Sequence, residues 1–196
     1  MSAFVERGNV SLIERGGADD TAQFLYRIWL ENKGMMPPSS ELMKVSPFLV
    51  IFDDYCSSSD SPDILFYGSQ TLFSDRYPEA EECDEANPKQ LLNEDYRHLV
   101  CAGYQDALGG EPVFETVGTG GLLGPRKPEI IYDRVILRFR KKVGSYLISY
   151  TIKRDEKWLY PRSNRSNLIG CSQQKPSYHL SYQAEQTNEF RPNEPT

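Results

Sequence analysis

The side chains of this 196-residue chain that could perform chemistry are few. Its two histidines, His98 and His179, do not support a Ser-His-Asp or Cys-His arrangement, because His179 falls in a polar C-terminal segment. Its four cysteines show no C-x-x-C spacing, so we expect free thiols and no metal. Solvated carboxylates, as in the acidic stretch 75–95, make poor general acids. The sequence therefore favours a protein that is not an enzyme.

Tyrosines are better candidates for contact with a small molecule. Tyr67 falls in an expected strand, and Tyr96 and Tyr104 fall in an expected helix. Their hydroxyl groups could line a pocket between sheet and helix, where a few polar groups orient a ligand. Ordinary core packing is the simpler explanation of the same residues.

A charged pair interrupts the apolar strand pattern of 130–141. Asp133 and Arg134 are adjacent, so they point to opposite faces of a strand and cannot pair with each other. One interpretation is that Asp133 bonds a neighbouring side chain or loop while Arg134 pairs across the sheet. The other places Asp133 at the mouth of a ligand cavity. In both cases Asp133 needs a partner, because an unpaired buried carboxylate is costly.

The same strand carries a basic strip that includes Arg138 and Arg140. One interpretation is that the strip docks on an acidic partner or on a second copy of the chain. The alternative is that these charges only prevent edge-to-edge association of strands.

Because three apolar residues alternate with three arginines along this strand, we expect one face of the sheet to be packed against the core and the other face to be largely exposed to water.

Composition excludes several classes of function. The net charge of −6 and a pI near 5.1 disfavour a nucleic-acid partner, which usually requires a basic face. The longest apolar run, FLVIF, is too short to span a bilayer, and the N-terminus lacks the apolar segment of a signal peptide. We therefore expect a cytoplasmic protein whose partners are small molecules or other proteins.

The pattern along the chain predicts an α+β domain at 20–154, between a flexible arm at 1–19 and a polar tail at 155–196. The expected helices are 21–32 and 88–108, the second with Asn87 as cap and Pro88 in the first helical position. The expected strands are 48–55, 63–71, 111–118, 130–141 and 145–154.

Particular stretches sharpen this order of elements. The segments RIWLENKGMMPPSSEL, LFYGSQT, GEPVFE and IIYDRVILRF resemble the corresponding stretches of short, stand-alone bacterial PAS-like proteins. The resemblance covers about residues 20 to 153 and rests on the set of motifs together. It implies a five-stranded antiparallel sheet in the order 2-1-5-4-3, with helices over one face enclosing a small-molecule cavity.

The resemblance also implies a role in signal transduction for the flanking helix 21–32. Such helices often mediate dimerisation, so we expect a homodimer in which Phe24, Ile28 and Trp29 contact the partner. No kinase, cyclase or DNA-binding segment follows the domain, so a signal must pass through another protein chain.

The chain departs from cofactor-binding members of that family. It lacks the N-C-R-F-L-Q type motif of flavin-binding relatives. Haem-binding relatives use a helical histidine, and His98 lies on the long helix without a supporting signature. The cofactor is therefore unknown, and His98 is kept with Asp133 and the tyrosines as a candidate ligand contact.

Together these observations predict a sensory or regulatory module that binds a small ligand, contacts a partner protein, or does both. The runner-up is a small-ligand carrier or enzyme of cone-like α+β fold, which a buried histidine or carboxylate with a perturbed pKa would favour. A third reading is a structural adaptor without a ligand.

Overall fold

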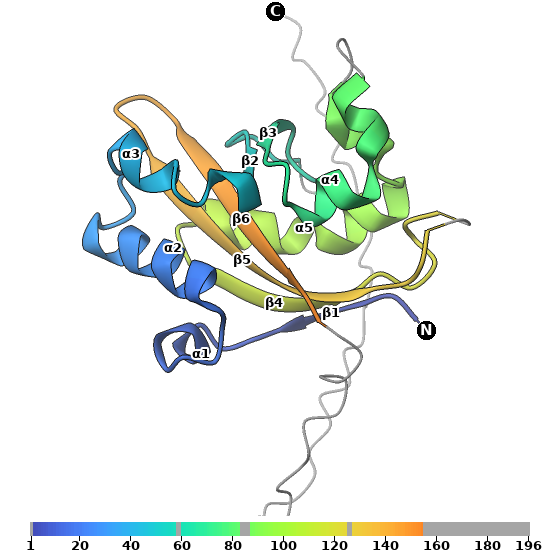
Figure 1. Cartoon of the computed structure of the whole chain (residues 1–196), viewed down its shortest axis with the longest axis horizontal. Helices are drawn as coiled ribbons and strands as arrows, with labels where there is room; N and C mark the ends of the chain where they lie inside the picture. The colour runs from blue at the N-terminus through green and yellow to red at the C-terminus, as the bar shows by residue number, and fades with distance from the viewer. Residues whose placement is uncertain (1, 58–59, 83–86, 125–126, 155–196) are drawn as a thin grey trace, which may run out of the picture. The chain divides into compact units, whose positions relative to one another are not determined.

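A computed structural model describes residues 2–57, 60–82, 87–124 and 127–154 of the chain (Figure 1). The chain divides into two units, Met1–Leu159 and Tyr160–Thr196, and the second unit lies wholly outside the described residues. The expected polar tail at 155–196, which includes His179, also lies outside the described residues.

The described residues form an α+β domain around a six-stranded antiparallel sheet, as the sequence predicted for the class of fold. In spatial order the strands are β1 (Phe4–Arg7), β4 (Val113–Gly118), β5 (Ile131–Arg140), β6 (Ser145–Lys153), β2 (Leu49–Phe52) and β3 (Ile64–Tyr67). The five strands from β4 to β3 run in the predicted order. Strand β1, at the edge of the sheet next to β4, was not expected.

Strand β1 corrects the prediction of a flexible arm at the N-terminus. It pairs with β4 from Phe4 opposite Gly118 to Arg7 opposite Glu115. Gly118 permits this pairing, because a β-carbon there would collide with the ring of Phe4. Four residues are too short a run for strand periodicity to be recognised in the sequence.

The longer helices begin at polar capping residues, whereas two of the short ones have no side-chain cap. The longer two are α2 (Asp20–Glu31) and α5 (Glu94–Leu108), and the shorter ones are α1 (Ser11–Glu14), α3 (Ser39–Leu42) and α4 (Leu72–Arg76), with 3₁₀ turns at η1 (Ser46–Phe48), η2 (Pro78–Glu82) and η3 (Pro88–Leu91). The Asp19 carboxylate accepts a hydrogen bond from the Ala22 amide at 2.9 Å, which caps α2.

The expected long helix is divided in two. Asn87 and Pro88 start only the short turn η3, and Leu92 returns to extended backbone with ψ of 134°. Asn93 then caps α5 by accepting from the Asp95 amide at 2.8 Å. The sequence holds two asparagine caps six residues apart, and the prediction used the first alone.

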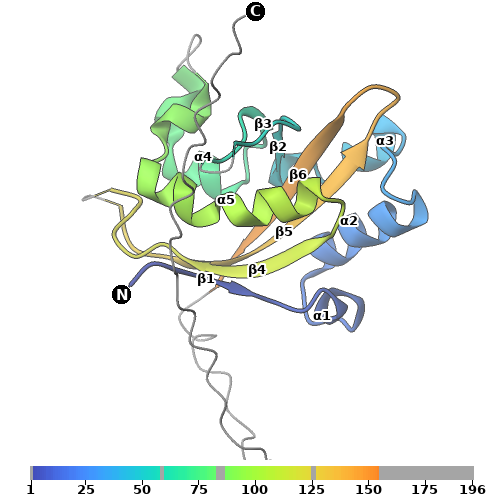
Figure 2. The same cartoon turned by 180° about the vertical axis from the view of Figure 1, so that it is seen from behind.

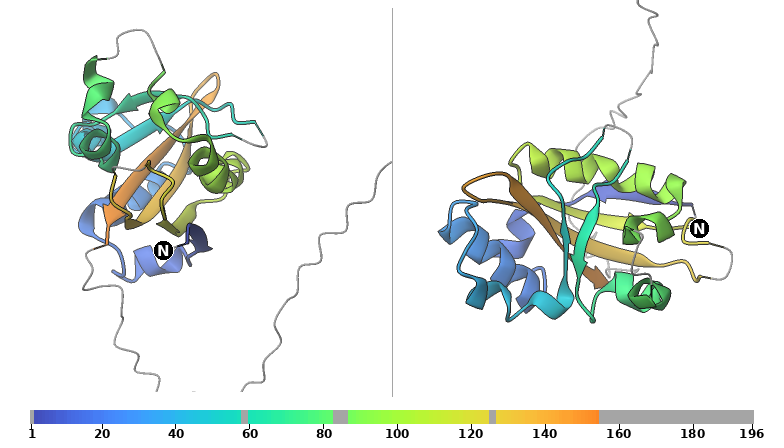
Figure 3. Two further views of the ribbon diagram at one scale, coloured as in Figure 1. Left: turned by 90° about the vertical axis from the view of Figure 1, so that its right-hand side faces the viewer. Right: turned by 90° about the horizontal axis from the view of Figure 1, so that it is seen from above.

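Helices cover both faces of the sheet, which corrects the expectation of helices on one face and of a largely wet arginine face. Helix α5 passes behind β5 and β6 in Figure 1 and in front of them in Figure 2, whereas α2 lies on the opposite side; Figure 3 shows the two helices flanking the strands. We call the face under α2 the outer face, with Val135, Leu137 and Phe139, and the face under α4 and α5 the inner face, with Arg134 and Ile136.

No helix in the described part of the chain combines the length and apolarity that crossing a membrane requires.

Candidate functional site

A pocket of about 70 Å³ lies between the inner face of the sheet and the segments α4 and α5. Its apolar wall comes from β2, β3, α4 and α5, and includes Val50, Phe52, Ile64, Phe73 and Val100. Its polar lining comes from tyrosines, hydroxyl residues and two arginines: Ser61, Arg76, Tyr77, Tyr96, Tyr104, Thr119, Tyr132, Arg134, Ser149 and Thr151. We call this space the inner pocket.

Two tyrosine hydroxyls meet in the wall of the inner pocket. The Tyr96 and Tyr132 oxygens lie 2.5 Å apart in a hydrogen bond that either can donate. Burial raises the pKa of Tyr96 and Tyr104, and it raises the pKa of Tyr132 to about 12. All three hydroxyls therefore stay protonated near neutral pH, where they act as hydrogen-bond donors or acceptors rather than as bases.

Arg134, which lines the pocket, belongs to a buried ion pair with Glu115, which lies behind the lining. Arg134 and Glu115 are each 1% exposed and stand opposite each other in the β5–β4 register. The Arg134 Nε donates to Glu115 Oε1 at 2.5 Å, and its Nη2 donates to the Val100 carbonyl at 2.7 Å. The guanidinium also lies 4.6 Å above the ring of Tyr104. This confirms the reading in which Arg134 pairs across the sheet.

Three polar atoms of the pocket wall are buried without a hydrogen-bond partner in the described part of the chain: Ser61 Oγ, Arg76 Nε and Tyr77 Oη. The distance from Arg76 Nε to Asp75 Oδ2 is 3.5 Å, which is longer than a good hydrogen bond. Burial raises the pKa of Tyr77, so its hydroxyl keeps its proton. Such orphaned groups are rare in native proteins and require an explanation.

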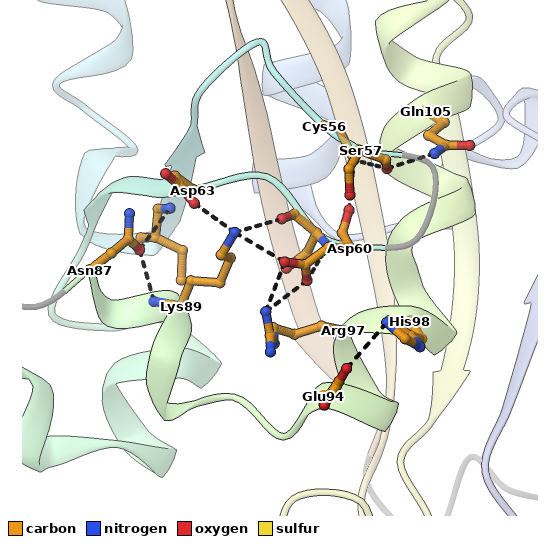
Figure 4. Close-up of polar contacts among 12 residues, drawn as sticks. Cys56, Ser57, Asp60, Asp63, Asn87, Lys89, Glu94, Arg97, His98 and Gln105 are labelled. Atoms are coloured by element: carbon orange, nitrogen blue, oxygen red, sulfur yellow. Dashed lines mark hydrogen bonds and ion pairs between the residues drawn. The ribbon is translucent and has the colours of Figure 1, made fainter.

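A polar network fixes the loop between β2 and β3, which carries the pocket residue Ser61. Figure 4 shows the side chains of Asp60, Asp63, Lys89 and Arg97 in this network. The Lys89 ammonium contacts Asp63 Oδ1 at 2.6 Å and donates to the Ser61 carbonyl at 3.2 Å. Arg97 on α5 binds both oxygens of the Asp60 carboxylate, at 2.9 and 2.8 Å. These bonds join the loop between β2 and β3 to η3 and α5, so the position of Ser61 is determined by several elements at once.

The structure brings Tyr96 and Tyr104, two of the predicted ligand contacts, into the inner pocket. Tyr67 lies beside it, with its ring centroid 4.9 Å from that of Phe73, which does line the pocket.

Two predicted contacts lie elsewhere. His98 is on the surface of α5, with its side chain 49% exposed and 3.9 Å from Glu94 (Figure 4). Asp133 lies among the outer-face residues, where it accepts from Thr116 Oγ1 at 2.6 Å and from Arg154 Nε at 2.8 Å. The reading of Asp133 at the mouth of the cavity was wrong, and the reading with a neighbouring partner is confirmed, because strand alternation separates Asp133 from Arg134.

The predicted partner contacts also separate. Ile28 is 3% exposed and packs into the core beneath α2, so it is not available on the surface. Phe24 and Trp29 are half-buried, and the Trp29 indole donates to the Arg138 carbonyl at 2.8 Å. The Arg138 guanidinium donates to the carbonyl of Leu108, the last residue of α5, and the Arg140 guanidinium donates to the carbonyl of Lys33, in the turn after α2.

Sequence reasoning missed Ser61, Arg76, Tyr77 and Tyr132 as pocket residues. Tyr132 could have been found, because it alternates with Arg134 on one strand face. Arg76 and Tyr77 stand in the acidic stretch that was interpreted as a solvated face. Ser61 stands in a serine-rich loop, and nothing in the sequence indicated its burial.

Cys56 and Cys101, the two cysteines that the structure describes, form no disulfide. Burial raises the pKa of Cys56 to about 11, so its thiol is protonated and a weak nucleophile near neutral pH. Within the described ranges no group of three or more His, Cys, Asp and Glu side chains is arranged to hold a metal ion.

A search with models of protein families finds no match to the chain, and neither do searches of curated proteins and of solved structures.

Proposed function

We propose that the chain is a PAS-like sensory module that binds a small ligand in the inner pocket and passes the signal to another protein. The observation that carries the proposal is the pocket itself, which lies where the PAS resemblance implies a cavity, between the sheet and its covering helices. The strand order β3-β2-β6-β5-β4 supports the same proposal, since it equals the order 2-1-5-4-3 of that family.

The lining favours binding over catalysis. The described residues of the inner pocket include no histidine and no carboxylate that could move a proton. The tyrosines there have raised pKa values, which keeps them neutral and able to fix a ligand by hydrogen bonds. A carrier or enzyme of similar architecture is the competing proposal, and it would need a reactive group that this lining does not offer.

Helix α2 and the neighbouring arginines are the proposed route to a partner or to a second copy of the chain. The exposed apolar side chains there include Leu30 and Met35, at 45% and 43% exposure, close to the half-buried Trp29. Arg140 is exposed beside them. A mixed apolar and basic surface of this kind suits docking on an acidic protein surface.

Native mass spectrometry of freshly purified protein, compared with its denatured mass, tests the proposal. Extra mass that is lost on denaturation would support a retained ligand. A dimer without a bound ligand would favour signalling by protein docking through α2. A monomer without a bound ligand that also gains no small molecule from a cell extract would argue against a sensor.

A further inference from the structure

The unpartnered groups of the inner pocket point to a class of ligand. We propose that this ligand is a short-chain carboxylate, whose oxygens accept hydrogen bonds from Ser61, Arg76 and Tyr77 and whose alkyl chain packs against the apolar wall. The inference rests on the proposed function, because it names the ligand class of the same pocket.

The first argument is hydrogen-bond satisfaction. Ser61 and Tyr77 are 3% and 4% exposed, so neither hydroxyl is solvated, and no acceptor for them lies in the described part of the chain. Burying such groups unsatisfied costs free energy that a ligand with acceptors recovers. The Tyr96–Tyr132 pair adds another donor, because two hydroxyls hold two protons and their mutual bond uses one. A site rich in spare donors selects a ligand rich in acceptors.

The second argument is charge. Arg134 is neutralised by Glu115. Within the described residues, the one ion pair of the Arg76 guanidinium, whose side chain is 13% exposed, is with Asp75, whose side chain is 68% exposed. No Asp or Glu is among the described lining residues. The pocket therefore carries an unbalanced positive charge in a largely desolvated place, where an anion is bound more strongly than in water.

The third argument concerns size and shape. A volume of about 70 Å³ exceeds the roughly 10–15 Å³ that admits one water and is below the roughly 150 Å³ of a cavity that takes benzene. An ionised carboxylate offers about four acceptor sites, which suits the donors present. Phosphate fits less well, because the apolar wall formed by Val50, Phe52 and Ile64 would leave some of its oxygens unsatisfied.

Calorimetric titration with propionate, propionamide and inorganic phosphate tests the ligand class. Propionate should bind saturably, and propionamide, which has the same shape without the charge, should bind about tenfold to a hundredfold more weakly. Equal or tighter binding of propionamide or of phosphate would overturn the carboxylate assignment and leave a ligand-binding pocket in place. If none of the three binds, the inference is overturned, and the proposed function is then decided separately by neutral and cationic solutes.

A matched pair of tyrosine variants tests the residues. Tyr77→Phe removes an unpartnered hydroxyl, so the free protein should be as stable as wild type or more so, while propionate affinity falls about tenfold. Tyr150→Phe removes a hydroxyl that donates to Asp19 at 2.5 Å on the outer face, so stability should fall and affinity should stay unchanged. Arg76→Gln should also weaken propionate while sparing propionamide. Wild-type affinity in both Tyr77→Phe and Arg76→Gln would refute the site.

Discussion

At the scale of single residues, the buried pair of Arg134 and Glu115 is the most consequential arrangement in the inner face. Glu115→Gln leaves the Arg134 charge buried without its counter-charge, since both side chains are 1% exposed. We predict that the free energy of unfolding falls by about 3–5 kcal/mol, measured by urea denaturation.

The matched control is Asp133→Asn, which weakens an ion pair on the outer face. Its partner Arg154 is 35% exposed, so solvent screens the lost charge and a loss of about 1 kcal/mol or less is expected. Equal losses in the two variants would contradict the claim that the Arg134 pair is desolvated.

Asp54 should make stability depend on pH. Its Oδ2 accepts from the Ser145 amide at 2.8 Å, and this bond lowers the pKa of the carboxyl, with further help from the charges of Arg138 and Lys141. Because the folded pKa lies below the unfolded value of about 3.9, Asp54 stabilises the fold above that pH. The contribution is lost as pH falls through the folded pKa.

The expected result for Asp54→Asn is therefore a variant less stable than wild type near pH 6, with a difference that shrinks towards about pH 3. Urea denaturation at several pH values measures the difference. A gap that stays constant or widens as the pH falls would show that the carboxylate charge is not the stabilising feature.

At the scale of elements, α5 approaches β5 and β4 closely because of one glycine. A β-carbon at Gly103 would lie 2.8 Å from Arg134 Nη2 and from both oxygens of Glu115. We predict that Gly103→Ala destabilises the fold by about 1–3 kcal/mol through overpacking, although alanine is the better helix former by roughly 1 kcal/mol.

Ala102→Gly supplies the comparison, because Ala102 is exposed on the same helix and its loss reports helix propensity alone. Thermal denaturation of both variants, with the ligand titration repeated on each, separates packing from propensity. A stabilised Gly103→Ala protein would contradict the close packing of α5 on the ion pair.

The elements also show how far the sequence could lead. Five strands and the helix 21–32 were predictable, because apolar periodicity and caps such as Asp19 are local signals. Strand β1 and the division between η3 and α5 were not predicted: the first depends on pairing with β4, far along the chain, and the second on a choice between Asn87 and Asn93.

At the scale of the whole molecule, the sequence did not indicate that helices cover both faces of the sheet. Arginines at alternate positions of β5 predicted a wet face, yet Arg134 is buried because Glu115, 19 residues away, neutralises it. The same dependence on contacts between distant residues explains why the sequence indicated only Tyr96 and Tyr104 among the pocket residues. Ser61, Arg76 and Tyr77 come from loops and short helices whose positions depend on long-range contacts such as those of Lys89 and Arg97.

The central claim is that a small ligand binds between the sheet and α4–α5, and methyl NMR tests it most directly because each sheet face has its own methyl groups. The protein would be titrated with propionate, 1-propanol and propylamine. We predict that at least one solute shifts the signals of Val50, Ile64 and Val100 saturably while those of Leu25 and Leu137 stay unchanged. No saturable shift with any solute, or equal shifts on both faces, would contradict the claim.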